Sequence, residues 1–209
     1  MMLYRIVKRI FDLIVSTILW VLTSPLMLVV AVLIKLSDGG EVFVGTPVRY
    51  GLDGKSFFMY KFRTMIPNAH EIAMSNGNMK DSLLSNHKLK GDIRVTRIGR
   101  ILRNTDLDEL PQLINVMLGH MSMVGPRPYY HDEIKHHLEQ YPEDQMYFND
   151  IFSVKPGLTG IWQVSGRNEI PFRKRLKMES QYALNPCILN DIYILLKTPW
   201  VVLTRKGVI

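Results

Sequence analysis

The stretch Leu13–Ile34 reads LIVSTILWVLTSPLMLVVAVLI and contains no charged residue. As an α-helix it would extend for about 33 Å, close to the thickness of the hydrocarbon core of a lipid bilayer. A cleaved signal peptide has a shorter apolar run, of about 7–15 residues, followed by small residues at the cleavage site. Because this run is longer and is followed by Lys-Leu-Ser-Asp-Gly-Gly, it predicts a membrane helix.

The dipeptide Ser24-Pro25 lies near the centre of this helix. A proline there removes one helical hydrogen bond, and its ring collides with the carbonyl four residues back, at Val21. We expect the helix to bend at this point, with the Ser24 hydroxyl donating a hydrogen bond to a freed carbonyl. A kinked helix that spans the membrane is the alternative, because proline is commoner in membrane helices than in soluble ones.

Basic residues flank the membrane helix on both sides: Arg5, Lys8 and Arg9 precede it, and Lys35 and Arg49 follow it. The bias between the two sides is modest, so a re-entrant helix that turns back to the side of entry satisfies both flanks. Asp12 lies one helical turn after Lys8. We expect these two residues to form an ion pair at the membrane edge, where an unpaired carboxylate would be costly.

After the membrane helix, short apolar runs at 42–44 and 57–62 flank the turn-forming residues Gly51–Gly54, a pattern typical of a β-hairpin. Residues 66–90 are polar and predict a variable surface excursion. Residues 188–203 mix apolar clusters with polar residues and include a tyrosine and a tryptophan. That segment suits either a helix in the membrane interface or a core helix.

The composition of the 209 residues suits one modest domain beside the membrane helix, and a hydrophobic fraction of 47% excludes a disordered protein. The net charge of +7 suits a partner that carries phosphates: nucleic acid, anionic lipid or a phosphorylated substrate. The single cysteine, Cys187, excludes an intrachain disulfide. We therefore predict a mainly helical α+β fold with a re-entrant membrane helix at 1–36. A domain at 37–209 would contain a small β-hairpin or sheet and amphipathic interfacial helices.

The acidic pair Asp108-Glu109 lies in the segment Arg103–Leu113, which reads RNTDLDELPQL. One interpretation is a capping box, in which Asp106 and Glu109 satisfy amide groups at a helix start. A second is a phosphoryl-transfer site, in which one carboxylate attacks phosphorus, its neighbour holds a divalent cation and Arg103 stabilises the phosphoryl oxygens. A zinc or iron site is disfavoured, because histidine and cysteine ligands at suitable spacing are missing from the sequence.

Positive charge is needed if a carboxylate is to attack a diphosphate, because the two repel each other until Mg²⁺ and arginines neutralise the phosphates. Arginines recur every three residues along one predicted helical face: Arg97, Arg100 and Arg103. This stripe is either a solvated surface or a phosphate cradle. Arg127 lies between two prolines that restrict its direction, which suits a preorganised phosphate ligand or a rigid surface turn.

Four motifs follow one another along the chain: Lys61-Phe62-Arg63-Thr64-Met65, Leu107-Asp108-Glu109-Leu110-Pro111-Gln112-Leu113, Gly125-Pro126-Arg127-Pro128 and Lys155-Pro156-Gly157-Leu158-Thr159-Gly160. In this order, and with the membrane helix, the chain resembles the monotopic polyprenyl-phosphate phosphoglycosyl transferases, which are bacterial sugar transferases. The likeness covers nearly the whole chain. It is greatest to the catalytic region of undecaprenyl-phosphate galactose or glucose phosphotransferases, and it includes the segment Trp162–Arg167.

The resemblance implies a two-step reaction. Asp108 attacks the sugar-linked phosphate of a UDP-sugar, with galactose or glucose as the sugar, and UMP leaves. Undecaprenyl phosphate then attacks the phosphosugar-aspartyl intermediate, as the first membrane step of exopolysaccharide, capsule or O-antigen synthesis. The resemblance also assigns roles to charged residues of the motifs: Glu109 helps to bind Mg²⁺, Arg103 meets the substrate phosphate, and Lys61, Arg63 and Arg127 belong to the phosphate and nucleotide region.

The resemblance further implies a location. The Ser24-Pro25 break resembles the re-entrant membrane helix of the family, whose two ends lie on the cytosolic side of the bacterial inner membrane. A spanning helix with its N-terminus inside would place everything after Lys35 in the periplasm, where nucleotide-activated substrates are absent. The expected partners are a UDP-sugar, undecaprenyl phosphate and membrane lipids, and a homodimer is an open alternative to a monomer.

Two functions without catalysis compete with this interpretation. The first is a basic membrane scaffold that docks on anionic lipids or assembles a polysaccharide complex. The second is binding of nucleic acid through the arginine stripe. The sequence contains no helix-turn-helix, zinc or aromatic RNA-binding motif, so nucleic acid is not an expected partner.

Overall fold

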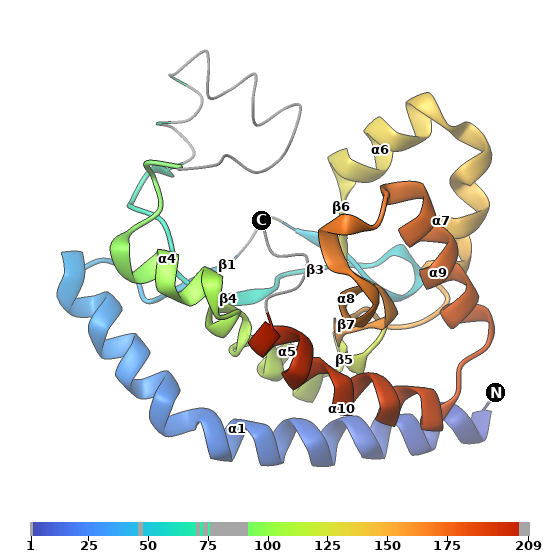
Figure 1. The fold of residues 1–209 in the computed structure, drawn as a ribbon, viewed down its shortest axis with the longest axis horizontal. Helices are drawn as coiled ribbons and strands as arrows, with labels where there is room; N and C mark the ends of the chain where they lie inside the picture. The colour runs from blue at the N-terminus through green and yellow to red at the C-terminus, as the bar shows by residue number, and fades with distance from the viewer. Residues whose placement is uncertain (1, 46–47, 70–71, 73–74, 76–91, 205–209) are drawn as a thin grey trace.

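The computed structural model describes residues 2–45, 48–69, 72, 75 and 92–204. One long helix, α1 (Met2–Asp38), lies along an edge of the molecule, and the other described elements pack on one side of it (Figure 1). It ends two residues beyond the predicted boundary at residue 36. Most of the surface excursion predicted at 66–90 lies outside the described residues.

Helices make up most of the described chain, which confirms the prediction of a mainly helical α+β fold. The helices after α1 are α4 (Arg97–Asn104), α5 (Gln112–Leu118), α6 (His131–Gln140), α7 (Gln145–Ile151), α8 (Ile161–Ser165), α9 (Phe172–Leu184) and α10 (Ile188–Thr204). Short 3₁₀ helices connect several of these elements: η1 (Leu52–Gly54), η2 (Leu107–Glu109), η3 (Pro142–Asp144) and η4 (Arg167–Glu169).

The strands are short: β1 (Phe43–Gly45), β2 (Arg49–Tyr50), β3 (Ser56–Phe57), β4 (Tyr60–Phe62), β5 (Ser122–Val124), β6 (Tyr129–Tyr130) and β7 (Gly157–Thr159). β2 and β3 form the predicted hairpin around η1, and β2 also pairs with β6. β1 pairs with β4, so the apolar run predicted as one strand at 57–62 is divided between two small sheets. β5 and β7 are parallel neighbours.

Helix α1 is continuous through Pro25 and bends part-way along its length, so its two arms diverge (Figure 1). The Ser24 hydroxyl donates to the Val21 carbonyl at 2.9 Å, as predicted for the carbonyl that the proline leaves without a partner. Residues Met2–Ser37 are long and apolar enough to cross a membrane, and only 17% of their most apolar 18-residue window is buried. Such exposure is typical of a membrane helix, because a core helix of a soluble protein would be mostly buried.

Both arms of α1 contact the same folded body. In the N-terminal arm, the Arg9 guanidinium donates to the carbonyls of Val116 and Met117, at 2.6 and 2.7 Å, and so satisfies the end of α5. The C-terminal arm contributes to a cluster of buried side chains: Met27, Val30, Ile34, Phe62 and Leu102. The body therefore sits against both arms, on one side of the bend.

A buried polar network joins the N-terminal arm to the body. Lys8 Nζ lies 3.3 Å from carboxylate oxygens of both Asp12 and Asp191, which confirms the predicted Lys8–Asp12 ion pair and adds a second partner from α10. Asp12 also accepts hydrogen bonds from the Ser122 hydroxyl and the Met123 amide, each at 3.0 Å. Because every carboxylate in this network has a partner, helix α1 is held in a defined position.

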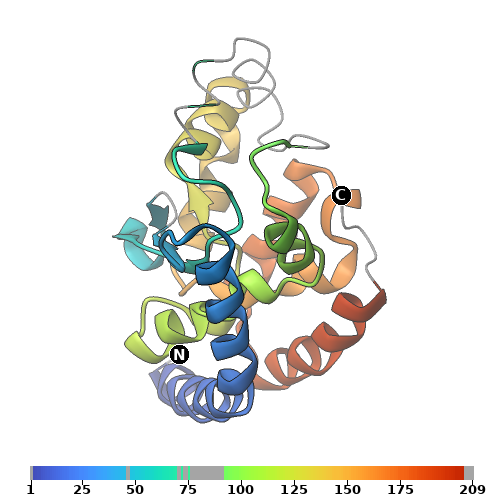
Figure 2. The same cartoon turned by 90° about the vertical axis from the view of Figure 1, so that its left-hand side faces the viewer.

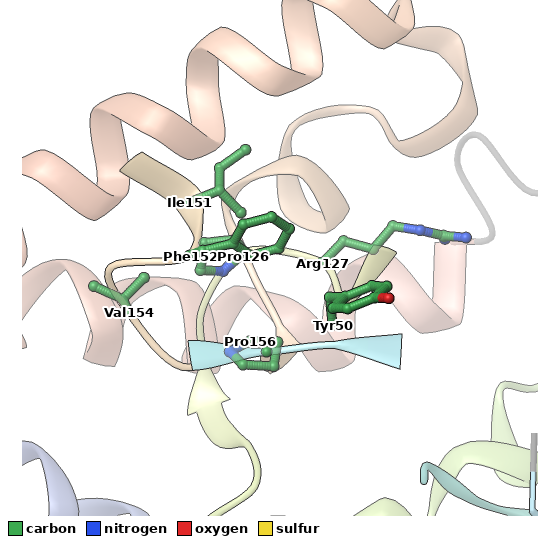
Figure 3. Close-up of a pocket in the computed structure, with 8 residues that line it drawn as sticks. Tyr50, Pro126, Arg127, Ile151, Phe152, Val154 and Pro156 are labelled. Carbon is green, nitrogen blue, oxygen red and sulfur yellow. The ribbon is translucent and has the colours of Figure 1, made fainter. Parts of the chain in front are cut away.

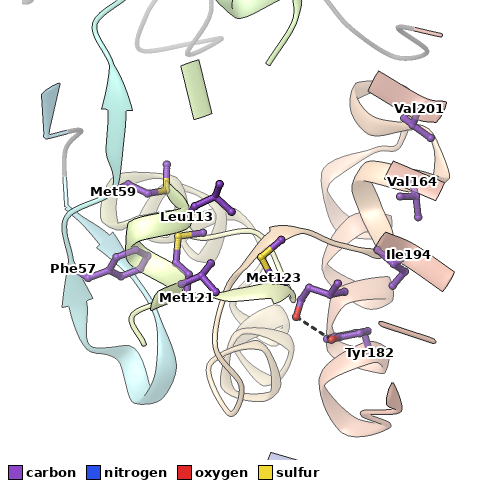
Figure 4. Packing of buried hydrophobic residues seen from close by; sticks show 11 residues of the cluster. Phe57, Met59, Leu113, Met121, Met123, Val164, Tyr182, Ile194 and Val201 are labelled. Carbon is purple, nitrogen blue, oxygen red and sulfur yellow. Dashed lines mark hydrogen bonds between the residues drawn. The ribbon is translucent and has the colours of Figure 1, made fainter. Parts of the chain in front are cut away.

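The main hydrophobic core lies where α5, β5 and the C-terminal helices meet (Figure 4). Leu113 and Val116 of α5 are buried in this core, which fixes the helix that follows the acidic pair. Figure 4 also shows the Tyr182 hydroxyl, which donates to the Val124 carbonyl at 3.1 Å. The core therefore anchors the segments on which the charged motifs lie.

Helix α10 runs beside the N-terminal arm of α1 at the lower edge of the molecule (Figures 1 and 2). Its buried face carries Asp191, Ile194 and Val201. Its other face exposes a set of large apolar side chains: Leu189, Ile192, Tyr193, Leu196, Trp200 and Leu203. The sequence left a core helix and an interfacial helix equally open. In the structure, α10 has one face buried in the core and one exposed apolar face.

Candidate active site

The acidic pair lies on a tight reversal of the chain. Helix α4 ends at Asn104, and Asp106 has a left-handed backbone (φ 55°, ψ 14°) that redirects the chain into η2. Asp106 makes no capping hydrogen bond through its side chain, and the Glu109 carboxylate contacts Lys61. The capping-box interpretation is therefore wrong, and Asp108 and Glu109 need another role.

A buried amide brings strand β4 and its lysine to this turn. Asn115 of α5 donates to the Phe58 carbonyl at 2.7 Å and accepts from the Tyr60 amide at 3.0 Å. This clamp fixes the chain directly before Lys61 against the helix that follows the acidic pair. Lys61 and Glu109, which are far apart in the sequence, are consequently neighbours in the fold.

Asp108 is nearly buried, with 8% of its surface exposed. Burial raises the pKa of its carboxyl to about 6, against the opposing positive charge of Lys61, whose Nζ lies 4.0 Å from Oδ2. The negative charge of Glu109 adds to the rise in this pKa, and Arg103 opposes it. A carboxylate that is poorly solvated in this way is available to react, because little water has to be removed from it before attack.

The pKa of Glu109 is shifted in the opposite direction from that of Asp108. Burial alone would raise its pKa, but Lys61 outweighs burial and lowers the pKa, with Nζ only 2.5 Å from Oε1. The charges of Arg127 and Arg49 lower it further. The two neighbouring carboxyls therefore have pKa values shifted in opposite directions, a pattern typical of acidic pairs whose members have different roles.

Arg103 lies at the end of α4, and its Nε donates to the Thr64 hydroxyl at 2.8 Å. Helix α4 approaches the backbone at Thr64 closely, since a Cβ on Gly99 would lie 2.0 Å from the Thr64 carbonyl oxygen. This contact requires glycine and brings α4 against the segment that contains Lys61. Arg103 lies close enough to Asp108 for its positive charge to lower the pKa of that carboxyl, and all three arginines of the stripe, Arg97, Arg100 and Arg103, are exposed.

Arg127 is a further cation of the site, and its positive charge lowers the pKa of Glu109. Its backbone amide donates to Glu179 at 3.1 Å, and its guanidinium carbon lies 5.5 Å from the centre of the Trp162 ring. Its Nε is buried and makes no hydrogen bond to any residue that the structure describes. Figure 3 shows the guanidinium pointing away from the apolar side chains of Ile151, Phe152 and Val154, which line a small hollow beside it.

Two glycine-containing motifs hold Arg127 in place. A Cβ on Gly157 would lie 2.1 Å from the Gly125 amide nitrogen, so the segments after β5 and around β7 touch backbone to backbone. The Gly125 amide donates to the Thr159 carbonyl at 2.9 Å, which closes the contact. Larger residues at these two glycines would force the segments apart and displace Arg127.

Comparison with known proteins agrees with the order of the motifs and with this charged cluster. Residues 3–205 match the sequence profile of the family described as "Bacterial sugar transferase". The chain belongs to the bacterial sugar transferase family. Its match covers both helix α1 and the charged cluster, so the two are parts of one family unit.

Named relatives of this sugar transferase are similar over most of its length. An undecaprenyl-phosphate galactose phosphotransferase of Salmonella typhimurium is 43% identical over 207 residues, which cover 97% of this chain and 42% of the relative. The exopolysaccharide production protein ExoY of Rhizobium meliloti is 41% identical over 203 residues, covering 95% and 86% of the two chains. A UDP-glucose:undecaprenyl-phosphate glucose-1-phosphate transferase of Klebsiella pneumoniae is 40% identical over 178 residues, covering 85% and 35%. The chain thus spans less than half the length of the Salmonella and Klebsiella relatives.

Arg63 of this sugar transferase contacts the segment that follows α1. Its Nε donates to the Glu41 carbonyl at 2.5 Å, and its guanidinium packs so closely on Gly40 that a Cβ there would lie 2.9 Å from it. Arg63 therefore supports the connection between α1 and β1. The sequence grouped Arg63 with Lys61 in one phosphate region, and that role stays a prediction.

The structure adds two arginines to which the sequence assigned no role at the site. The Arg49 guanidinium lies 3.0 Å from the centre of the Tyr130 ring and donates to the Pro128 carbonyl, and burial lowers its pKa to about 10. Arg167 pairs with Asp106 at 2.8 Å. The sequence held a signal that Arg49 has a special role, because it is a charged residue between Val48 and Tyr50. It held no signal for the partner of Arg167.

The acidic pair suits a magnesium ion only if the substrate supplies further ligands. The described residues contain no group of three or more His, Cys, Asp and Glu side chains that could hold a metal by themselves. Mg²⁺ in proteins is commonly held by one or two carboxylates together with substrate phosphates and water. The oxygens of Asp108 and Glu109 are donors of this kind, so the site fits a metal that arrives with a diphosphate.

Proposed function

We propose that this sugar transferase moves a sugar 1-phosphate from a UDP-sugar, with galactose or glucose as the sugar, to undecaprenyl phosphate and releases UMP. The observation that carries the proposal is the acidic pair itself. Asp108 is buried with a raised pKa, Glu109 is held ionised by Lys61, and the positive charges of Arg103 and Arg127 act on the two carboxyls. The names of the Salmonella and Klebsiella relatives support these substrates.

In the first proposed step, an Asp108 oxygen attacks the phosphorus bonded to the sugar, and the bond from that phosphorus to the bridging oxygen breaks. The bridging oxygen and its electron pair leave with UMP, so a phosphosugar-aspartyl intermediate remains. In the second step, a phosphate oxygen of undecaprenyl phosphate attacks the same phosphorus and the bond to Asp108 breaks. The carboxylate is regenerated, and the product is a lipid-linked diphosphate sugar.

The basic side chains make this attack electrostatically feasible. Lys61 stands within ion-pair distance of both carboxyls, and Arg103 and Arg127 would bind phosphoryl oxygens. Glu109 would hold Mg²⁺ together with phosphate oxygens of the substrate, and the ion would supply positive charge that neutralises the diphosphate. Repulsion between Asp108 and the diphosphate is thereby reduced where the new bond forms.

The proposed location is the cytosolic face of the bacterial inner membrane, with α1 re-entrant. Both arms of α1 contact the same body, through Arg9 in one arm and Met27 in the other, which favours two ends on one side of the bilayer. The exposed apolar face of α10 runs beside the N-terminal arm and would lie in the interface. Undecaprenyl phosphate, a membrane lipid, would then reach the acidic pair from the bilayer.

The test uses the full chain in lipid nanodiscs with undecaprenyl phosphate, Mg²⁺ and a panel of UDP-sugars, and UMP release is measured. We expect turnover with UDP-galactose or UDP-glucose and none with Asp108→Asn, which should still insert in the membrane. Without undecaprenyl phosphate, each enzyme molecule should release one UMP and then stop. Mass spectrometry should find the phosphosugar on the peptide that contains Asp108. Failure of all UDP-sugars to release UMP, or full activity of Asp108→Asn, would contradict the proposal and favour a scaffold.

A further inference from the structure

An ion pair joins the turn that carries Asp108 and Glu109 to the short helix η4. Arg167 Nη2 lies 2.8 Å from Asp106 Oδ2, and the arginine comes from η4, 61 residues further along the chain. The Arg167 side chain is nearly buried, at 12% exposed, while the Asp106 side chain is 39% exposed. A pair with one buried member is screened less by water and salt than a pair on the open surface.

Both members of the pair have a left-handed backbone, with φ of 55° at Asp106 and 51° at Arg167. Among the described residues other than glycine, positive φ occurs at Asp53, Asn68, Asp106 and Arg167. Aspartate and asparagine tolerate this region because their short polar side chains bond locally. Arginine has no such compensation, so the fold holds Arg167 in a strained conformation, and strain of this kind concentrates at functional sites.

Asp106 controls the direction in which η2 leaves α4. It is the point at which the chain reverses, two residues before Asp108, and its carbonyl accepts from the Glu109 amide at 3.2 Å. A rotation at Asp106 would therefore move the carboxyl of Asp108. One glycine, Gly166, separates Arg167 from α8, the helix that carries Trp162 beside Arg127. The ion pair thus connects the turn that carries the acidic pair to the segment around α8, which contacts Arg127.

We propose that Arg167 is a positioning residue: through its ion pair with Asp106, it holds the turn that carries Asp108 in the direction required for attack on phosphorus. The inference rests on the proposed function for its kinetic consequence. It does not place Arg167 in contact with the substrate. Loss of the pair would leave the nucleotide sugar bound as before but Asp108 poorly aligned, and a misplacement of about 1 Å can cost about 100-fold in rate.

The kinetic test removes each side chain by glycine, which adopts positive φ readily, so neither variant adds backbone strain. Arg167→Gly and Asp106→Gly should each lower kcat by about 10- to 100-fold, with KM for the UDP-sugar changed less than about threefold. Because both changes break one interaction, the double variant should be no slower than the slower single variant. Arg167→Lys should recover about tenfold over Arg167→Gly, since lysine can still pair with Asp106.

The matched control is Glu143→Gln, which removes an exposed ion pair with Arg173. Its kcat and KM should equal those of the wild type. The proposal is overturned if Glu143→Gln loses as much activity as Arg167→Gly, or if the losses of the two glycine variants multiply in the double variant. A KM raised more than tenfold with kcat unchanged would also overturn it, because Arg167 would then bind substrate directly.

A second measurement does not depend on activity. Hydrogen exchange of the peptide that spans residues 105–111 reports on the amides of Glu109 and Leu110, which donate to the carbonyls of Asp106 and Leu107. We expect these amides to exchange at least about tenfold faster in Arg167→Gly and unchanged in Glu143→Gln. Unchanged exchange in Arg167→Gly overturns the proposal. If the wild type released no UMP, only the proposed function would fail, and this measurement would still decide the role of Arg167.

Discussion

At Asp108, burial opposes the charge that nucleophilic attack requires. The pKa is raised to about 6 mainly by burial, so at neutral pH the fold holds an ionised carboxylate where a neutral group would be more stable. Lys61 offsets part of this cost from 4.0 Å away. The ionised Asp108 therefore lowers the free energy of unfolding, as expected of a residue retained as a nucleophile rather than for stability.

Asp108→Asn should therefore stabilise the protein while it abolishes activity. The folded pKa lies above the unfolded value, so the wild type loses stability as the pH rises from about 4 to about 6, and the full penalty is present above that range. The shift corresponds to about 1–3 kcal/mol. We expect the Tm of Asp108→Asn to exceed that of the wild type at pH 8, with a smaller gap at pH 4.5. A lower Tm at pH 8, or an equal gap at both pH values, would refute this account.

The same raised pKa sets the pH dependence of the reaction. Attack requires the ionised form of Asp108, so kcat/KM should fall about tenfold per pH unit below about 6. UMP release measured between pH 5 and 8 tests this expectation. A profile that stays flat down to pH 5 would show that the group that must be ionised is not the buried carboxyl of Asp108.

Lys61→Met tests the charge shared by the acidic pair. Removing this cation should raise the pKa of both carboxyls and weaken neutralisation of the diphosphate, with a loss of about 100-fold in kcat/KM at pH 7 and partial recovery at higher pH. Lys55→Met, which removes an exposed lysine of the hairpin, is the control and should be silent. Equal losses in the two variants would argue against a specific role for Lys61.

At the level of elements, helix α1 combines a membrane signal with extensive contacts to the body. A straight helix could cross a bilayer, but the bend and the contacts of both arms favour a helix that enters and returns. The bend follows from one proline, and its hydrogen-bond deficit at Val21 is met by Ser24. The element therefore contains both the cause of its bend and the compensation for it.

Cysteine labelling distinguishes the two arrangements of α1. In a Cys187→Ser background, which removes the exposed native thiol, single cysteines at Leu3 and Leu36 should both react with an impermeant reagent from the cytosolic side of inverted vesicles. Both positions are highly exposed in the fold and lie beyond the two ends of the uncharged run at 13–34, so we expect the reagent to reach them. Labelling of the two positions from opposite sides would establish a spanning helix and exclude the re-entrant arrangement.

At the level of the whole molecule, α10 and the N-terminal arm of α1 lie side by side along one edge (Figures 1 and 2), and both helices expose large apolar side chains. Exposed apolar side chains gathered on neighbouring helices are typical of membrane contact. The buried Lys8–Asp191 pair fixes the two helices to each other. The two helices would thus lie on the membrane and hold the acidic pair at a fixed distance from its surface.

An environment-sensitive fluorophore can test this orientation. Attached to Leu196→Cys in the Cys187→Ser background, it should shift to shorter wavelength when the protein moves from mild detergent into nanodiscs of bilayer lipid, because α10 would lie at the headgroup boundary. The same fluorophore at Ile93→Cys, which is equally exposed but belongs to the turn before α4, should not shift. A shift of equal size at both positions would contradict the proposed orientation.

The sequence by itself determined the features that depend on neighbouring residues. The uncharged run predicted α1, Pro25 its bend, the spacing of Lys8 and Asp12 their ion pair, and the turn residues at 51–54 the hairpin. Each of these is set by local geometry and by hydrogen bonds within a few residues. Local pattern also identified the acidic pair as unusual, although it left a capping role open.

Only the tertiary structure decided which distant groups meet. Asn115 brings Lys61 to Glu109, while Arg63, two residues further along, turns to the Glu41 carbonyl. No sequence pattern paired Asp106 with Arg167. Such contacts depend on packing between segments that are far apart in the chain, and the free energy of that packing is shared by the whole core. For this reason the sequence could name the charged residues of this protein, but the fold determined which of them act on one another.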